Sequence, residues 1–336
     1  MRLLIWGAGA IGGTIGAYLA RAGHDVTFVD RVQEHVDAIR SRGLRITGPI
    51  EEFTAQAPAY TPEELTGVWQ TIVLAVKAQD TEAAAQSLLP HLAADGQVVS
   101  AQNGLNELTL ARILGPERTI GAFVNFGADY HEPGVILYGG RGAVVLGEID
   151  GAMTPRLAEL HRVFQDFEAN AIQTDNIWGY LWGKMGYGAQ LFVTALTNES
   201  IADALAMPEY RALYIAVAQE VMRITQAKQI RPLGFNGFAP AAFMAGADPA
   251  AIEASFAQMV DFNRHSAKTH SGIWRDLAVR KRRTEVDAQL GPIVEEGRAL
   301  GIDAPITAAT VEMIHEIEEG RRAMSLDNLD ELKRLL

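Results

Sequence analysis

The chain contains, at residues 2–30, the sequence RLLIWGAGAIGGTIGAYLARAGHDVTFVD. An apolar run from Arg2 to Trp6 ends abruptly in a glycine-rich turn, Gly7-Ala8-Gly9-Ala10-Ile11-Gly12-Gly13. A helical pattern then begins at Thr14 and stops near Gly23, and a second apolar run ends at Asp30. This order of strand, glycine turn, helix and strand predicts a βαβ unit.

The next hundred residues continue the alternation of strands and helices. Buried strands are predicted at Ile72–Val76, Gln97–Ala101 and Thr119–Val124, with a helix from Asp80 to Leu92. Short β-branched runs that alternate with helices indicate a mainly parallel, doubly wound sheet. The glycine-punctuated stretch from Gly134 to Gly147 predicts short strands, an antiparallel edge that closes the first domain.

The pattern changes beyond about residue 175, where strand-like runs stop. Helices are predicted at Ile177–Leu196, Pro208–Gln229, Pro249–Asn263 and Thr284–Leu300, with a last pair after Pro305. The predicted fold is therefore an α/β Rossmann-type N-terminal domain, residues 1–170, followed by an all-α C-terminal domain, residues 171–336.

Composition excludes several classes of protein. The 336 residues carry 29 Lys and Arg against 41 Asp and Glu, a net charge of −12, which argues against nucleic acid as a partner. The chain has no Cys, so it has neither a disulfide framework nor a thiolate-held metal, and its scattered histidines predict no metal site. No apolar run approaches the ~20 residues that span a bilayer, so we expect a cytoplasmic protein without membrane association.

The glycine turn predicts a dinucleotide site. Gly7, Gly9 and Gly12 have the GxGxxG spacing directly after a strand and before a helix. Glycines at these positions permit the tight turn, the close approach of the backbone to a pyrophosphate and the packing of helix on strand. The predicted cofactor-binding residues of this loop are Gly7, Ala8, Gly9, Ala10, Ile11 and Gly12.

Two residues at the end of the second strand give opposing signals about the cofactor. Asp30 can accept hydrogen bonds from the adenosine ribose hydroxyls, which favours NAD(H), whereas Arg31 can pair with the 2′-phosphate of NADP(H). Asp30 can instead cap the helix that follows. The balance leans slightly to NAD(H) and leaves NADP(H) open.

Polar residues also follow the next two predicted strands. Lys77 comes just after Val76, and Asn103 lies in Gln102-Asn103-Gly104. Taken singly, each fits a solvated lysine or an Asn-Gly turn. Open α/β sheets bind ligands at the carboxyl ends of their strands, so together they indicate one shared site.

These motifs resemble those of the ketopantoate reductase (2-dehydropantoate 2-reductase) family. The resemblance extends over nearly the whole chain, and its further matches are Pro133-Gly134-Val135 with Gly139-Gly140, Trp182-x-Lys184-Met185, Thr194-Ala195-Leu196, Asp276, Thr284-Glu285-Val286-Asp287, and Gly301-Ile302 with Pro305. It implies reduction of a 2-oxo acid to a 2-hydroxy acid by a nicotinamide bound between a Rossmann domain and a helical domain.

The resemblance also implies roles for particular residues. Lys184 would be the general acid that protonates the carbonyl oxygen, Glu285 would hold the substrate or the lysine, and Lys77 and Asn103 would lie between cofactor and substrate. An ammonium suits this task because it stabilises and protonates a developing alkoxide. The alternative is a lysine that extends from an apolar helix to water. Gly183, Gly186 and Gly188 around Lys184 indicate a close approach by a ligand or by backbone, because glycine is costly inside a helix.

Departures from the family pattern surround the expected substrate. The family has asparagines one and two turns after the lysine, where this chain has Gly188 and Phe192, and only Ser271 stands where the family has consecutive serines. The expected substrate-binding residues are therefore Asn103, Lys184, Gly188, Phe192, Ser271 and Glu285, with His270, Trp274, Tyr187 and Gln190 as weaker candidates that fit core packing or surface positions better.

The resemblance predicts ketopantoate or a relative of it as the substrate, and the wider and more apolar pocket expected at Gly188 and Phe192 favours a bulkier or more apolar 2-oxo acid. The alternatives are another hydroxyacid or opine-type dehydrogenase, or a nucleotide-binding regulator without catalysis. An apolar helical domain of this size often forms dimers, so a homodimer stays open.

Overall fold

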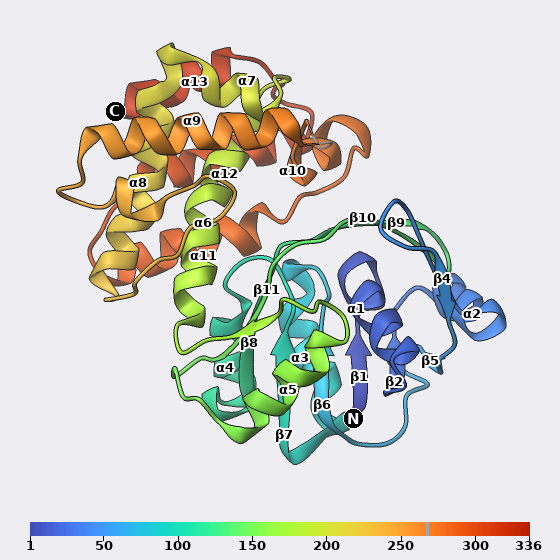
Figure 1. Cartoon of the computed structure of the whole chain (residues 1–336). Coiled ribbons are helices and arrows are strands. Elements are labelled where there is room, and N and C mark those ends of the chain that lie inside the picture. The colour runs from blue at the N-terminus through green and yellow to red at the C-terminus, as the bar shows by residue number, and fades with distance from the viewer. Residues whose placement is uncertain (267–268) are drawn as a thin grey trace. The chain divides into compact units, whose positions relative to one another are not determined.

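The computed structural model describes residues 1–266 and 269–336. The chain forms two compact units, Met1–Ile177 and Trp178–Leu336 (Figure 1). The division lies a few residues after the predicted domain boundary at residue 170.

The first unit is built on an eight-stranded sheet in the order β12-β11-β8-β7-β6-β1-β2-β5. The strands from β8 to β5 in this order pair in parallel, whereas β11 pairs antiparallel with β8. The order reverses between β1 and β6, which confirms the doubly wound Rossmann-type fold. The strands are β1 (Arg2–Trp6), β2 (Asp25–Val29), β5 (Ala59–Tyr60), β6 (Trp69–Leu74), β7 (Leu92–Ser100), β8 (Thr119–Val124), β11 (Val144–Glu148) and β12 (Ile172–Gln173).

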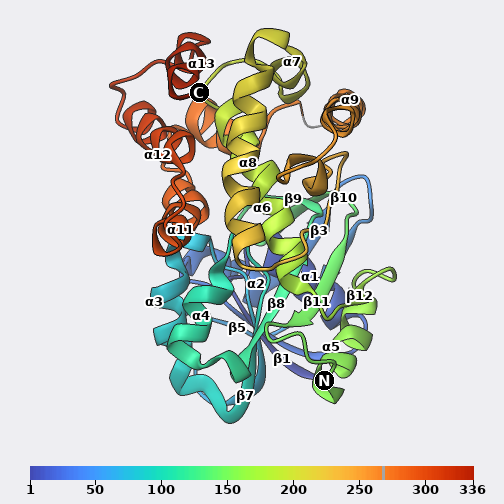
Figure 2. The same cartoon turned by 90° about the vertical axis from the view of Figure 1, so that its left-hand side faces the viewer.

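Both faces of this sheet are covered by helices, as a parallel sheet requires. Alternate residues of β1 face opposite sides: Leu3 and Ile5 join the cluster formed with α1 (Ala10–Arg21) and α5 (Pro155–Gln165). Leu4 and Trp6 join the cluster formed with α3 (Thr81–Leu88) and α4 (Asn106–Leu114). Figure 2 shows α3 and α4 on one side of the sheet and α5 on the other.

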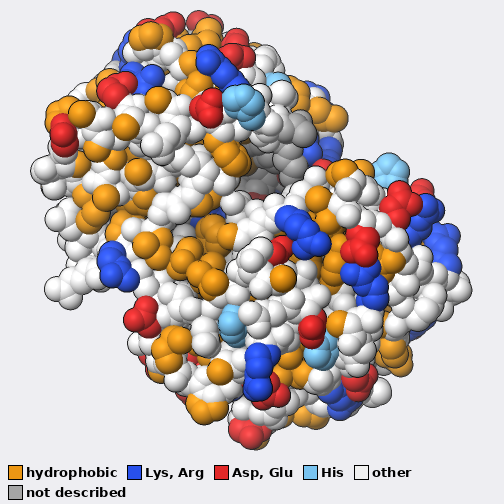
Figure 3. All heavy atoms as spheres, viewed as in Figure 1, with side chains coloured by type: hydrophobic (Ala, Val, Ile, Leu, Met, Phe, Trp, Pro, Cys, Tyr) orange, Lys and Arg blue, Asp and Glu red, His pale blue; other side chains and the backbone are white. Residues whose placement is uncertain are grey.

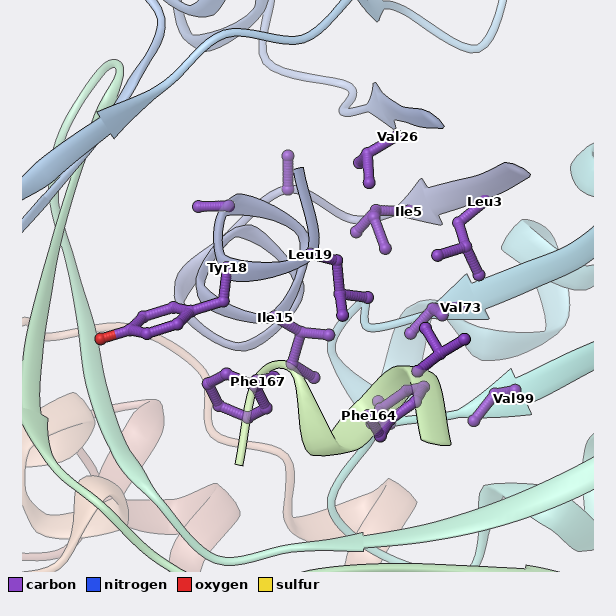
Figure 4. Close-up of a cluster of buried hydrophobic side chains, with 14 of the residues drawn as sticks. Leu3, Ile5, Ile15, Tyr18, Leu19, Val26, Val73, Val99, Phe164 and Phe167 are labelled. Carbon is purple, nitrogen blue, oxygen red and sulfur yellow. The ribbon is translucent and has the colours of Figure 1, made fainter. Parts of the chain in front are cut away.

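The cluster under α1 forms the largest part of the described core of this unit. In Figure 4, Ile15 and Leu19 of α1 point toward Val73 of the sheet and Phe164 of α5. Tyr18 points the other way, and its ring packs edge-on against Tyr138, with the ring centroids 5.7 Å apart. The helix therefore has apolar partners on two sides.

A second, four-stranded sheet lies beyond Tyr18. Its order is β4-β3-β10-β9, formed by β3 (Leu44–Thr47), β4 (Phe53–Ala55), β9 (Gly127–Glu132) and β10 (Val135–Gly140). The prediction that Gly134–Gly147 forms one antiparallel edge is therefore wrong for its first half. β10 joins the separate sheet because Val135–Leu137 pair in parallel with Arg45–Thr47, and of this stretch β11 alone belongs to the large sheet.

The second unit is helical, which confirms the predicted all-α domain. Across its described residues, the β structure is a single bridge between Phe235 and Phe238. Its main helices are α6 (Ile177–Thr194), α7 (Ile201–Ala206), α8 (Arg211–Ala227), α9 (Pro249–His265), α10 (Gly272–Trp274), α11 (Val286–Ala299), α12 (Pro305–Glu318) and α13 (Asp327–Leu332).

A buried carboxylate connects two of these helices. Glu220 of α8 accepts hydrogen bonds from the backbone N–H groups of Ile306 and Thr307, each at 2.8 Å, and from the Thr307 hydroxyl at 2.7 Å. The first N–H groups of a helix have no partner within the helix, so Glu220 satisfies the start of α12 from outside. Burial raises the pKa of Glu220, although these hydrogen bonds oppose the shift.

Candidate functional site

The glycine turn connects β1 to α1 and requires glycine at two positions for packing. Gly7 has a φ of +98°, and a Cβ there would lie 2.8 Å from the backbone nitrogen of Val76. A Cβ on Gly12 would lie 2.1 Å from the carbonyl oxygen of Gly7. The loops after β1 and β6 therefore touch at the point where the strand order reverses.

Gly9 is different, because among the described residues no atom beyond its chain neighbours lies within 4 Å of a Cβ placed there. Gly9 is also the N-cap residue of α1, and no side chain caps that helix end. An open glycine beside the N-terminus of a long helix fits a pyrophosphate, which the helix N–H groups and dipole attract. The helix starts at Ala10, earlier than the predicted Thr14, so Ala10 and Ile11 belong to its first turn.

Asp30 lies at the end of β2 and holds the glycine loop through the backbone. One carboxylate oxygen accepts a hydrogen bond from the N–H of Ala8 at 3.0 Å, and the other accepts from the N–H of Val32 at 3.0 Å. The alternative that Asp30 caps the next helix is wrong, because the N-cap of α2 (Gln33–Arg42) is Val32. The Asp30 carboxylate thus stays at the strand end where a ribose would bind.

Arg31 points to solvent and forms an exposed ion pair. Its guanidinium lies 3.1 Å from the carboxylate of Asp80, and 75% of its side chain is exposed. Pairs of this kind contribute little to stability, about 0–1 kcal/mol, so Arg31 is free to exchange this partner for a ligand phosphate.

Lys77 and Asn103 follow β6 and β7, and a buried network connects their two loops. The Gln102 side-chain amide donates to the carbonyl oxygen of Val76 at 3.0 Å and to the Thr81 hydroxyl at 2.8 Å. Asn106 accepts from the Thr81 hydroxyl at 2.9 Å and donates to the carbonyl oxygen of Asn103 at 2.7 Å. This network fixes the backbone of the two loops that carry Lys77 and Asn103. Lys77 is half-buried, whereas Asn103 is exposed.

Helix α6 carries Lys184, which is half-buried between the buried residues Gly183 and Met185. The expected close approach to the glycines is confirmed for two of them. A Cβ on Gly183 would lie 1.9 Å from the carbonyl oxygen of Leu233, and one on Gly186 would lie 2.8 Å from the ring of Phe238. Both glycines are thus explained by packing within the helical unit.

Gly188 has no such neighbour in the part of the chain that the structure describes, because no atom outside its own helix backbone lies within 4 Å of a Cβ placed there. Residues four apart share a helix face, so this open position lies one turn beyond Lys184. Phe192, a further turn along, is fully buried, and its expected contact with substrate stays a prediction.

Two of the weaker candidates belong to the helical core. Gln190 is fully buried and donates to the carbonyl oxygen of Tyr214 at 3.0 Å. The Tyr187 hydroxyl accepts from the Asn263 side chain at 2.8 Å, and burial raises the pKa of Tyr187 to about 12.

Around α10, side chains bond mostly to their neighbours in sequence. The Ser271 hydroxyl caps this short helix by accepting from the N–H of Trp274 at 3.1 Å, so it retains its own proton for donation. The rings of His270 and Trp274 lie against one another with centroids 4.0 Å apart.

Glu285 is the N-cap residue of α11, and the threonine before it is held firmly. Thr284 donates to Glu318 from its N–H at 2.7 Å and from its hydroxyl at 2.8 Å. His315 lies 3.2 Å from Glu318 and 2.8 Å from Asp287. Burial lowers the pKa of His315, but hydrogen bonds to Asp287 and Glu318 outweigh it and raise the pKa above 6.5.

The described surface and side-chain clusters add four observations. Within residues 1–266 and 269–336, no group of three His, Asp or Glu side chains could hold a metal ion, and no helix has the length and apolar character needed to cross a membrane. On the face drawn in Figure 3, acidic and basic side chains lie interspersed. The basic run after Asp276 is partly neutralised, because that carboxylate lies 3.1 Å from Arg280 and 2.8 Å from Arg282.

Comparison with known families identifies both units. Residues 3–151 match the family model of ketopantoate reductase PanE/ApbA, and residues 176–318 match the model of its C-terminal domain. A 2-dehydropantoate 2-reductase of Archaeoglobus fulgidus is 29% identical over 321 residues, which are 95% of this chain and 98% of that protein.

Solved structures agree with this match. The ketopantoate reductase of Ralstonia eutropha is 27% identical, with a TM-score of 0.80 over 96% of this chain and 99% of that one. A D-mandelate dehydrogenase with NADH and anilino(oxo)acetate has a TM-score of 0.81 over 96% of this chain and 99% of that one; at 21% identity it shows the shared fold alone. The chain therefore belongs to the ketopantoate reductase family of nicotinamide-dependent oxidoreductases.

Proposed function

We propose that this protein reduces a 2-oxo acid, either ketopantoate or a bulkier or more apolar relative, to the 2-hydroxy acid. The observation that carries the proposal is the combination of a dinucleotide loop open at Gly9 with a half-buried lysine, Lys184, one turn from the open position Gly188.

The residues at the end of β1 and β2 fit a dinucleotide. The loop from Gly7 to Gly12 and the start of α1 would hold the pyrophosphate, and Asp30 would accept from the ribose hydroxyls. Lys77 and Asn103 would lie toward the nicotinamide. When bound, the reduced nicotinamide supplies the hydride for the carbonyl carbon. We propose NAD(H) as the preferred cofactor, because the Asp30 carboxylate repels a 2′-phosphate. Arg31, which can exchange Asp80 for a phosphate, makes NADP(H) the alternative.

Lys184 would act as the general acid. As the carbonyl carbon is reduced, negative charge develops on its oxygen, and the ammonium stabilises that charge and transfers one proton to it. Glu285, next to the fixed Thr284, would hold the substrate or the lysine in position. Ser271 would donate a hydrogen bond from its hydroxyl to the substrate carboxylate.

Gly188 would set the width of the substrate pocket. An amide at this position would supply hydrogen bonds for the hydroxyl of ketopantoate, whereas glycine leaves space for a larger substituent. Phe192 would contribute apolar character near the same helix face. A specificity change of this kind is expected to be worth about 1–3 kcal/mol, or roughly 10- to 200-fold in kcat/KM.

The test measures oxidation of NADH and of NADPH with a panel of 2-oxo acids that runs from ketopantoate to aromatic members. Wild type is expected to favour a larger 2-oxo acid, and Gly188→Asn to shift the preference toward ketopantoate. Ketopantoate turned over by wild type far better than every larger acid would contradict the predicted substrate.

The catalytic role of Lys184 is tested in the same assay. Lys184→Ala is expected to lower kcat by roughly 10²–10⁴-fold while cofactor binding stays nearly unchanged. Lys333→Ala is the matched control, because the Lys333 ammonium makes surface contacts alone, a 3.9 Å ion pair with Asp330 and a cation–π contact 5.1 Å from the ring centroid of Tyr210. Equal kcat values for Lys184→Ala and wild type would exclude the general acid, and cofactor binding without turnover of any carbonyl would indicate a regulator instead of an enzyme.

A further inference from the structure

His35 of α2 is fully buried, yet both of its ring nitrogens contact backbone. Its Nε2 lies 2.8 Å from the carbonyl oxygen of Ala8, in the glycine loop. Its Nδ1 lies 2.9 Å from the backbone nitrogen of Gly134, in the turn between β9 and β10. One imidazole therefore joins the cofactor loop to the second sheet.

These two contacts determine where the ring proton lies. The Gly134 N–H can only donate, so Nδ1 must accept and carries no proton. The Ala8 carbonyl can only accept, so Nε2 carries the proton and donates it. His35 is thus neutral, and it is held as the Nε2–H tautomer.

The same residue of the glycine loop is held from its other side. The Ala8 N–H donates to Asp30, while the Ala8 carbonyl accepts from His35. Ala8 lies between Gly7 and Gly9, so both peptide groups that lead into α1 are fixed in direction. Gly134 is fixed in turn, because its own carbonyl accepts from the N–H of Arg45 at 2.9 Å.

We infer that His35 is a positioning residue for the cofactor: its Nε2–H holds the Ala8 carbonyl and so keeps the glycine loop in the shape that receives the pyrophosphate. This inference rests on the proposed dinucleotide site. It assigns the second sheet a role as well, since that sheet supplies the N–H that selects the tautomer. A loop that is held in its binding conformation before the ligand arrives binds the ligand more tightly, because less conformational entropy is lost on binding.

Two substitutions separate the two nitrogens. The side-chain amide of Gln reaches about as far as Nε2, so His35→Gln can still donate to Ala8 while it loses the bond from Gly134. The side-chain oxygen of Asn occupies the region of Nδ1, so His35→Asn can still accept from Gly134 while it leaves the Ala8 carbonyl without its donor. Both variants remove one ring and one hydrogen bond, so their thermal stabilities should fall similarly.

The readout is the dissociation constant of NADH and NADPH, measured by the fluorescence of the bound nicotinamide, with the melting temperature measured in parallel. His35→Asn should weaken cofactor binding by about tenfold relative to His35→Gln, the effect of one lost hydrogen bond. His161 supplies the matched control, because its Nε2 also contacts a buried carbonyl, that of Ala171 at 2.7 Å, away from the glycine loop. Its Gln and Asn variants should bind cofactor equally.

The outcomes distinguish a failure of the proposed dinucleotide site from a failure of the role inferred for His35. If wild type binds neither cofactor, the proposed dinucleotide site fails and the inference fails with it. If wild type binds and the two His35 variants bind equally, the inference alone is wrong. Nitrogen chemical shifts of histidine-labelled wild type test it without any variant: an Nδ1–H tautomer or a charged ring at His35 would overturn it, and an Nε2–H tautomer would support it.

Discussion

A methyl group added at Gly9 should separate cofactor binding from stability. Gly9 has a φ of −71° and a ψ of −159°, an extended conformation that alanine also adopts. Within residues 1–266 and 269–336, the added Cβ meets no atom within 4 Å apart from its chain neighbours. Alanine lowers the entropy of the unfolded chain, a gain of about 0.4–1 kcal/mol, but it is a poorer N-cap than glycine by a similar amount. The two effects oppose each other, so the stability of Gly9→Ala should lie within about 1 kcal/mol of wild type.

Cofactor binding should respond quite differently. The pyrophosphate is expected in the open space at Gly9, where the methyl group would force it away from the N–H groups of α1. Insertion of one methyl group into a filled site costs about 1–3 kcal/mol. That energy corresponds to a dissociation constant for NAD(P)H that is roughly 5- to 150-fold higher.

The assay combines a urea unfolding curve with a fluorescence titration of NADH and NADPH. Gly291→Ala is the matched control, because Gly291 of α11 also has open space around its Cβ and should leave the dissociation constant unchanged. Gly12→Ala should fail in both measurements, since its Cβ would overlap the carbonyl oxygen of Gly7. If Gly9→Ala binds cofactor as tightly as wild type, the pyrophosphate does not lie against Gly9 and the proposed site is wrong.

Two further predictions concern side-chain hydrogen bonds that stabilise the fold. Thr81→Val should destabilise the first unit by about 1–3 kcal/mol in urea unfolding, because it leaves the Asn106 side-chain oxygen without its hydrogen-bond donor. Thr81→Ser keeps the hydroxyl and is the control. Equal urea midpoints for the two variants would show that the hydroxyl contributes nothing to stability. His315→Gln should lower the free energy of unfolding more in acid than in base. The folded state raises the pKa of His315 above 6.5, so the charged imidazole stabilises the fold below pH 6.5. This stabilisation is lost as the pH rises through the raised pKa. Melting temperatures of wild type and variant that differ equally at about pH 6 and about pH 9 would exclude this titration.

The strands of the large sheet could be predicted because their signal is local. β1 and β8 have the predicted bounds, Arg2–Trp6 and Thr119–Val124, since a strand buried on both faces is a continuous apolar run. β3 and β4 were missed because they are short and half-exposed, and because the partner of β3, β10, lies about ninety residues away in sequence. The predicted start of α1 is too late, because the low helix propensity of Gly12 and Gly13 indicates a turn, whereas both lie in the helix and pack closely against neighbouring atoms.

The candidate site shows the same division. The glycine loop and Asp30 could be predicted from spacing alone, because the turn from β1 to α1 is short and β2 follows in the same βαβ unit. His35 had no signal in the sequence, since its partners lie 27 and 99 residues away and a lone histidine in a polar helix is unremarkable. Gln102 was predicted only as a neighbour of Asn103, whereas its amide connects two loops that the sheet brings together.

The glycines of α6 bear most directly on the size of the substrate. A glycine inside a helix costs up to about 1 kcal/mol relative to alanine, so each needs a reason. The backbone of Leu233 supplies that reason for Gly183, and the ring of Phe238 supplies it for Gly186. Nothing in the described helical unit supplies one for Gly188, where a side chain would fit. The glycine that packing in the described helical unit does not require is the one on the helix face of Lys184, and the proposed pocket for a 2-oxo acid larger than ketopantoate would account for its presence.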